Sequence, residues 1–377
     1  MQIDQRVKTN GKWERTTTGA PLTRPQLALV FGAGDTLRER ATWNELAALY
    51  PGARIVACST AGEIVGERVT DDNLVVTAVE LEHGRVVVAA TPVGDAPDCV
   101  ALGAALAGQL PHDGLVHVLV FSEGLKVNGS ALVAGLVGAL PARVAVTGGL
   151  AGDGGRFERT TVCLDGPDQT QQIIAIGLYG ERLHVGFGSR GGWDPFGPER
   201  RITRSQGNVL YELDGEPALD LYKRYLEHHA AGLPATGLLF PLTVRSETGA
   251  PVVRTILAID ETTRSMTFAG DVPTGYRARL MRTNVEGLVA GASEAAETTL
   301  TGAGATGPEL AILVSCVGRK LVLKQRVEEE VESVREILGD RTTLTGFYSY
   351  GEISPFEPAA PCELHNQTMT ITTIAER

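Results

Sequence analysis

The sequence has few cysteines, few aromatic residues and no excess of positive charge, and these shortages exclude several classes of protein. Its five cysteines (58, 99, 163, 316 and 362) are widely spaced and form no CxxC pair. This pattern favours a reducing cytoplasm over a disulfide framework or a zinc site. The net charge of −11, from 34 basic and 45 acidic residues, argues against nucleic acid or an anionic membrane as a partner.

Long apolar runs are also missing. No run approaches the roughly 20 residues that a membrane-spanning helix needs, so membrane insertion is not expected. Residues 1–24 are polar and lack the apolar segment of a secretory signal; we interpret them as an N-terminal extension. Neither a GxxxxGK[ST] loop nor an HExxH pair occurs, which leaves nucleotide binding and zinc hydrolysis without sequence support.

A strand–helix–strand pattern with two glycine loops occurs three times. The copies run from Leu27 to Glu63, from Val116 to Asp153, and from Leu310 to Glu352. In each copy a glycine lies three residues after the first strand, and a Gly-Glu or Gly-Asp pair follows the second strand. The acid follows the last residue of the first strand by 32, 32 and 37 residues, which indicates a shared plan.

Such crossovers join parallel strands, so the glycine loops of each copy should open at the carboxyl ends of its strands. This edge is where open α/β sheets bind ligands. Strand-like runs between the copies predict added antiparallel strands. We therefore expect an α/β protein with mixed sheets and two closely packed domains, in keeping with 43% apolar and 21% charged residues.

Five sequence blocks, "CSTAGEI", "TGGLAGDG", "SCVGR", "GFYSYGEISP" and "LHNQT", resemble the FIST family, named for F-box and intracellular signal transduction proteins. The resemblance extends over nearly the whole chain and implies a FIST N-terminal domain at 25–213 and a FIST C-terminal domain at 214–377. It also implies a sensory module that binds a small ligand, amino acids being the usual suggestion. Family members often carry an output domain; this chain ends after its last strand, so we expect a separate partner such as a histidine kinase or cyclase.

The glycine loops and their neighbours supply the candidate ligand-binding residues. These are Cys58, Ser59, Thr60, Gly62, Glu63, Gly148, Gly149, Asp153, Cys316, Arg319, Tyr348, Tyr350 and Glu352. The three acids could hold an ammonium group, or each could accept hydrogen bonds from its own turn. Arg319 could clamp a carboxylate or be an ordinary solvated arginine. No catalytic residue is predicted.

Three alternatives to a ligand-binding sensor remain open at this point. The first is a pure protein-interaction scaffold, which predicts an apolar surface patch and no enclosed pocket. An enzyme could use Cys316, which lies beside two basic residues, or the three acids, but no histidine near Cys316 in the sequence could act as its base. The resemblance also implies haem, since some family members bind it and sense nitric oxide. His365 in "LHNQT" is then the first candidate axial ligand and His184 the second. Both histidines could equally be ordinary core or edge residues.

One further segment stands out, "GSRGGWDPFGPERR" at residues 188–201, which places Trp193 and Phe196 among glycines and prolines. It could form a lid, the junction between the domains, or a plain turn with buried aromatic side chains.

Overall fold

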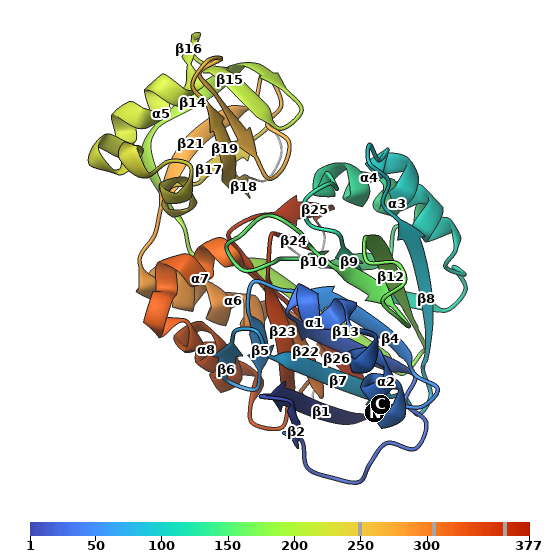
Figure 1. The fold of residues 1–377 in the computed structure, drawn as a ribbon. Helices are drawn as coiled ribbons and strands as arrows, with labels where there is room; N and C mark the ends of the chain where they lie inside the picture. The colour runs from blue at the N-terminus through green and yellow to red at the C-terminus, as the bar shows by residue number, and fades with distance from the viewer. Residues whose placement is uncertain (248–250, 304–306, 357–359) are drawn as a thin grey trace.

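A computed structural model describes residues 1–247, 251–303, 307–356 and 360–377. It consists of a large α/β body and a smaller lobe, which lies at the upper left in Figure 1. The lobe is formed by residues 194–282, and the rest of the described chain forms the body. The predicted class, α/β with mixed sheets, is confirmed. No described helix is long and apolar enough to cross a membrane.

The body contains three six-stranded sheets. The first has the order β11 (Val162–Leu164), β4 (Arg54–Ser59), β3 (Leu27–Gly32), β7 (Leu74–Glu80), β1 (Gln2–Thr9) and β2 (Lys12–Arg15). The second has β25 (Cys362–His365), β24 (Gly351–Pro355), β10 (Ala145–Leu150), β9 (Leu115–Ser122), β12 (Gln172–Tyr179) and β8 (Arg85–Pro92). The third has β13 (Leu183–Arg190), β26 (Met369–Glu376), β22 (Leu310–Cys316), β23 (Thr343–Ser349), β5 (Glu63–Val65) and β6 (Arg68–Thr70).

Each sheet is built around one of the three predicted copies. The pairs β3–β4, β9–β10 and β22–β23 are parallel, as the strand–helix–strand pattern predicts. Helices cover their outer faces: α1 (Gly34–Arg38) and α2 (Arg40–Leu49) on the first sheet, α3 (Cys99–Gly108) and α4 (Gly129–Ala139) on the second, and α6 (Val285–Ala303), α7 (Val317–Leu323) and α8 (Glu328–Leu338) on the third. The short helix α7 occupies a segment that the sequence predicts as a loop.

Local signals set the helix boundaries. The side chains of Asp98 and Asn128 accept hydrogen bonds from backbone N–H groups at the starts of α3 and α4, respectively. Gly339, at φ 80°, ends α8. Residues 1–24, expected to be a polar extension, contribute β1 and β2, because β1 pairs antiparallel with β7 along its length.

The strand that follows each glycine–acid pair crosses into another sheet. From the first copy, β5 pairs with β23 in the third sheet. From the third copy, β24 pairs with β10 in the second sheet, and the segment after the second copy supplies β11 beside β4 in the first sheet. The exchange is cyclic, so each sheet is completed by a strand from another copy.

The inner faces of the three sheets meet in one apolar core. At its centre lie Phe31 of the first copy, Phe121 of the second and Phe347 of the third. The ring centroids of Phe31 and Phe347 are 4.9 Å apart, and each lies 5.7–6.0 Å from Phe121. All three rings are buried. Aromatic pairs at these separations add to the free energy gained from burying their area.

The lobe has its own core and an eight-stranded sheet. Its strands are β14 (Asp194–Gln206), β15 (Val209–Leu213), β16 (Glu216–Pro217), β17 (Leu242–Arg245), β18 (Val252–Arg254), β19 (Ile256–Asp260), β20 (Ser265–Phe268) and β21 (Arg277–Arg282). Helix α5 (Ala218–Leu226) packs its apolar face on this sheet. The domain boundary predicted at 213/214 falls inside the lobe, between β15 and β16.

Polar contacts join the lobe to the body. Arg254 of the lobe donates a 2.8 Å hydrogen bond to the carbonyl of Leu364, and the Gln367 amide donates to the Leu238 carbonyl at 2.9 Å. The Asn128 amide donates to Asp271 at 3.0 Å. Two of these three contacts use residues of the "LHNQT" block, which lies between β24 and β26. The block therefore helps to dock the lobe.

We expect Gly186→Ala to destabilise the protein by roughly 1–3 kcal/mol, because an added Cβ would lie 2.1 Å from the carbonyl oxygen of Thr299 in α6. Gly138→Ala in α4 is the matched control: its Cβ would meet nothing within 4 Å, and alanine should leave stability unchanged or raise it by up to about 1 kcal/mol. Urea unfolding of both variants measures the difference. Equal effects would contradict the packing argument.

Candidate functional site

The glycine loops at the ends of the parallel strands meet at one place, which we call the three-loop junction (residues 59–63, 150–153 and 348–352). The backbone N–H of Ala61 donates to the Tyr348 carbonyl, and the Tyr348 N–H donates to the Gly62 carbonyl, each at 2.8 Å. The Gly152 N–H donates to the Ser59 carbonyl at 2.9 Å. The predicted residues are thus brought together, but their backbones bond to one another.

Glu63 and Glu352 occupy matching places in this junction. Thr60 and Thr70 donate their hydroxyl hydrogens to Glu63, and the N–H of Asn73 donates as well. Glu352 accepts from the Ser349 hydroxyl and from both the N–H and hydroxyl of Thr368. Burial dominates over these donors and raises the pKa of each carboxyl to about 7. Within the described residues, both acids are held by their own turns and neighbouring strands.

Asp153 differs from the two glutamates. It accepts hydrogen bonds from the N–H groups of Phe157, Glu158 and Arg159 and from the Tyr350 hydroxyl. Burial opposes ionisation here, but these donors hold the pKa of Asp153 below its usual range. The loop they fix places the ring of Phe157 on that of Tyr350, with centroids 4.2 Å apart.

Arg319 is completely buried and forms a 2.7 Å ion pair with Glu330 of α8. It also donates to the carbonyl of Gly191 at 2.5 Å and to that of Leu288 in α6 at 2.8 Å. Removing one partner of a buried ion pair costs several kcal/mol, because the other charge is left uncompensated. The arrangement favours a structural role for Arg319, in which it joins the segment after β13 to α6.

The cysteines and Gly148–Gly149 are also enclosed. Cys58 and Cys316 are buried, and burial raises the pKa of both thiols. A thiol that stays protonated is a poor nucleophile. Gly148 and Gly149 lie in β10, where a Cβ on Gly148 would collide with the Val120 carbonyl at 1.9 Å. Their proposed contact with a ligand stays a prediction.

The two candidate haem ligands lie far apart. His184 lies near the start of β13, where it pairs with Ala375. Arg190 ends the same strand, six residues further and so about 20 Å away. His365 lines the same pocket as Arg190 and is therefore far from His184. Nε2 of His365 lies 2.9 Å from the Ser354 carbonyl, to which it must donate because a carbonyl only accepts. Burial lowers the pKa of His365 to about 4, so the ring is neutral. Only Nδ1, the nitrogen nearer the ring's own backbone, is left for a metal, and this position does not fit an axial haem ligand.

A pocket of about 420 Å³ lies between the body and the lobe beside His365, and we call it the hinge pocket. The body supplies Arg190–Trp193, one face of α6 (Gly287, Ala290, Gly291 and Glu294), Phe356, His365 and Thr368; the lobe supplies Asp194, Thr243, Pro251, Val253 and Met281. Glycines make this wall compact: a Cβ on Gly192, at φ 70°, would lie 2.0 Å from the Gly287 carbonyl. Four glycines thus contribute to the wall of this pocket, and none of them belongs to the predicted ligand set.

Glu352 of the three-loop junction and Arg319 of α7 both contact residues that line the hinge pocket. Glu352 accepts hydrogen bonds from the N–H and hydroxyl of Thr368, which lines the pocket. Arg319 donates to the carbonyl of Gly191, which also lines the pocket, and to a backbone carbonyl of α6. The segment 188–201 is the first crossing from body to lobe, one of the roles the sequence allowed, and Trp193 donates its indole N–H to the Gln367 carbonyl. Sequence reasoning missed Glu294, Arg190 and Phe356; the "SRGGWD" stretch was the available signal for this region.

Two further pockets lie along the seam between lobe and body, with volumes of about 210 and 420 Å³. They share Phe157 and Leu257, and Tyr350 lines the smaller one. Tyr350 is thus the one residue of the predicted ligand set that lines any of the pockets described here.

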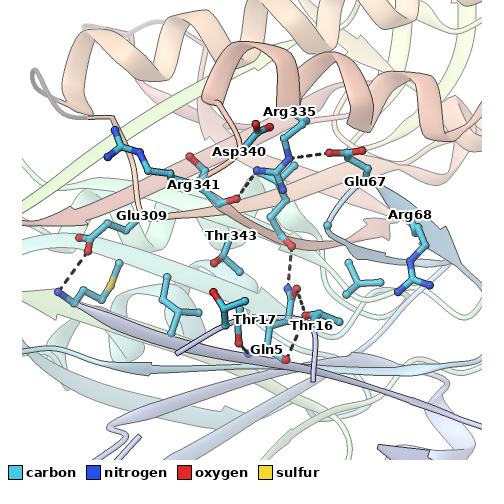
Figure 2. A pocket seen from close by; sticks show the side chains of 17 residues that line it. Gln5, Thr16, Thr17, Glu67, Arg68, Glu309, Arg335, Asp340, Arg341 and Thr343 are labelled. Atoms are coloured by element: carbon cyan, nitrogen blue, oxygen red, sulfur yellow. Dashed lines mark hydrogen bonds and ion pairs between the residues drawn. The ribbon is translucent and has the colours of Figure 1, made fainter. Parts of the chain in front are cut away.

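The largest of the pockets described here, about 800 Å³, lies at the opposite end of the body, near the amino ends of β22 and β23. Figure 2 shows Arg335 at its centre, with the guanidinium between Glu67 and the backbone of Thr342. The side-chain amide of Gln5, which also lines this pocket, donates a hydrogen bond to the Leu344 carbonyl. Its central cation is already paired, and none of the residues predicted from the sequence lines it, so size alone does not make it the functional site.

We expect Glu352→Gln to change the pH dependence of stability, because glutamine cannot ionise. The folded carboxyl titrates near pH 7 and an unfolded glutamate near pH 4.5. Between these values the unfolded chain releases a proton that the folded protein keeps. The free energy of unfolding of the unsubstituted protein should therefore fall relative to the variant, by up to roughly 1.4 kcal/mol per pH unit, as pH rises from 4.5 to 7.

Urea unfolding at pH 5, 6, 7 and 8 measures this difference. Exposed Glu297 on α6 supplies the control, since Glu297→Gln should follow the unsubstituted protein at every pH. A constant offset between Glu352→Gln and the unsubstituted protein would contradict the raised pKa.

Comparisons with known proteins show which family models match the chain and which proteins it is similar to. The model of the FIST N domain matches residues 26–216 and that of the FIST C domain matches residues 218–355. An uncharacterized protein of Methanocaldococcus jannaschii, MJ1623, is 33% identical over 84 residues, which are 22% of this chain and 16% of that protein. The crystal structure of cyanuric acid hydrolase from A. caulinodans aligns with 94% of this chain and 90% of its own, at 10% identity and a TM-score of 0.36.

Proposed function

The chain belongs to the FIST family, a family of sensory domains in signal transduction, and on this premise we propose that it binds a small ligand in the hinge pocket. The observation that carries the proposal is the shared wall: α6, His365 and the turn after β13 belong to the body, whereas Thr243, Val253 and Met281 belong to the lobe. A ligand there touches both parts at once. Its volume, about 420 Å³, lies in the range of pockets for small molecules.

A ligand in this position can couple binding to the position of the lobe. A ligand shifts an equilibrium between two arrangements only by as much as its affinities for the two differ. Because the lobe supplies part of the wall, any movement of the lobe changes the ligand's contacts and therefore its affinity. The proposal extends to a cytoplasmic protein whose lobe position is sensed by a partner such as a histidine kinase or cyclase, as the family suggests.

The geometry gives less support to the enzyme alternative. A cysteine enzyme needs a thiolate within reach of a base, and burial keeps the thiols of Cys58 and Cys316 protonated. The three acids accept hydrogen bonds from their own turns or from the adjoining segments. A sensory role needs only selective binding, which the hinge pocket can provide.

The proposal predicts that a ligand from a screen of amino acids, organic acids and amines raises the melting temperature, because binding to the native state stabilises it. Ala290 is exposed on α6 and lines the hinge pocket, so Ala290→Trp should fill the pocket without entering the core. We expect this variant to lose the ligand-induced shift while its unliganded melting temperature stays within about 2 °C of the original, because surface substitutions change stability little.

Ala48→Trp is the matched control, an equally exposed alanine on α2 that lines none of the pockets described here. It should keep the full shift. Retention of the shift in both variants would place the ligand outside the hinge pocket, and loss in both would show that the effect of Ala290→Trp is not specific to this pocket.

A further inference from the structure

The polar groups of the hinge pocket divide into those already bonded and those left for a ligand. Arg190 donates from one nitrogen to the carbonyls of Ser189 and Phe356, and its guanidinium lies over the Phe356 ring, 4.8 Å from the centroid. The Trp193 indole N–H is bonded to the Gln367 carbonyl and the Thr368 hydroxyl to Glu352. The donors closest to the pocket are thus largely committed to the protein.

Within the described residues, the groups left over are the Nε and Nη2 of Arg190, the Thr243 hydroxyl and three acceptors. His365 is only 2% exposed, and its Nε2 is committed to Ser354, so Nδ1 carries a lone pair with no partner among the described residues. Asp194 and Glu294 also line the pocket, and neither carboxylate has a hydrogen bond or ion pair within the described part of the chain. With Arg190 counted, the charged groups of the pocket still sum to −1.

Acceptors together with a net negative charge favour one chemical class. An ammonium or amidinium group offers several N–H donors and a positive charge, and such charge-assisted hydrogen bonds are about twice as strong as neutral ones. An anionic ligand would have to approach two carboxylates and would find only the partly committed Arg190. The lone pair of His365 would also face an acceptor rather than a donor.

We propose that the hinge pocket binds an organic cation, a small amine or amidine whose N–H groups bond to Asp194, Glu294 and Nδ1 of His365. This rests on the proposed function, because it names the ligand class of the same pocket. It is narrower than the amino acids that the family suggests, since recognition of a ligand carboxylate is not part of it. The aliphatic portion of the ligand would lie against Val253, Met281 and the ring of Phe356.

Calorimetric titration with 1,4-diaminobutane, butylamine and butyrate at low ionic strength tests the proposal. We expect both amines to bind and butyrate to show no measurable heat. The double variant Asp194→Asn with Glu294→Gln keeps the size of both side chains and removes both charges, so it should weaken amine binding about tenfold or more. Glu297→Gln, one turn along α6 and exposed, should bind like the unsubstituted protein.

The possible results distinguish the cation proposal from the proposed function on which it rests. Binding of butyrate as tightly as butylamine, or unchanged amine binding in the double variant, overturns the cation proposal. If another ligand then binds and Ala290→Trp abolishes that binding, the proposed function stands without it. If Ala290→Trp affects the binding of no compound, both the cation proposal and the proposed function are overturned. Amine binding that is lost in both the double variant and Ala290→Trp supports both.

Discussion

The contact among Phe31, Phe121 and Phe347 is the interaction on which the body of this protein depends. Each ring projects from a central strand of a different sheet, and the centroids lie 4.9–6.0 Å apart. A six-stranded sheet with helices on one face still has an apolar inner face that must be covered. Here each sheet is covered by the other two. The cyclic exchange of β5, β24 and β11 then makes the three sheets inseparable, because each lacks a strand without its neighbour.

This arrangement decides what the strand ends can do. In an open α/β sheet the loops at the carboxyl ends are free to hold a ligand. In this protein the three sets of loops converge on a common centre, and the backbone groups of Ala61, Tyr348 and Gly152 satisfy one another there. Glu63 and Glu352 stay buried because each is surrounded by hydroxyl and N–H donors. The pocket for which we propose ligand binding lies instead at the seam with the lobe, and Thr368 and Gly191 connect it to the centre.

The sequence predicts the periodic part of this structure and misses the part that depends on tertiary pairing. The parallel pairs follow from apolar runs of strand length, glycine loops and an intervening helix, and all three are present. Which sheet receives β5 or β24 is not encoded locally, since three residues such as Glu63–Val65 can pair with any free edge. The hinge pocket could not be predicted from the sequence for a related reason. Arg190, Glu294 and His365 are far apart in the sequence and form no recognisable motif. Arg319 and Glu352 were singled out as ligand-binding candidates, and this stays a prediction; their burial against Glu330 and Thr368 follows only from the fold.

The seam between lobe and body combines a small apolar cluster with hydrogen bonds. Met281 of the lobe packs with Trp193, Leu288 and Leu323 of the body. Arg254, whose pKa burial lowers to about 10, donates a hydrogen bond across the seam to the Leu364 carbonyl. Three buried polar atoms at the same seam, Nδ2 of Asn366, Oε1 of Gln367 and Oγ1 of Thr255, have no partner within the described residues. Each unpaired buried group costs about 1–3 kcal/mol relative to a paired one. Separating the seam returns these groups to water and recovers that cost, whereas separating the phenylalanine core would recover nothing. The proposed function therefore assigns ligand-dependent movement to the lobe.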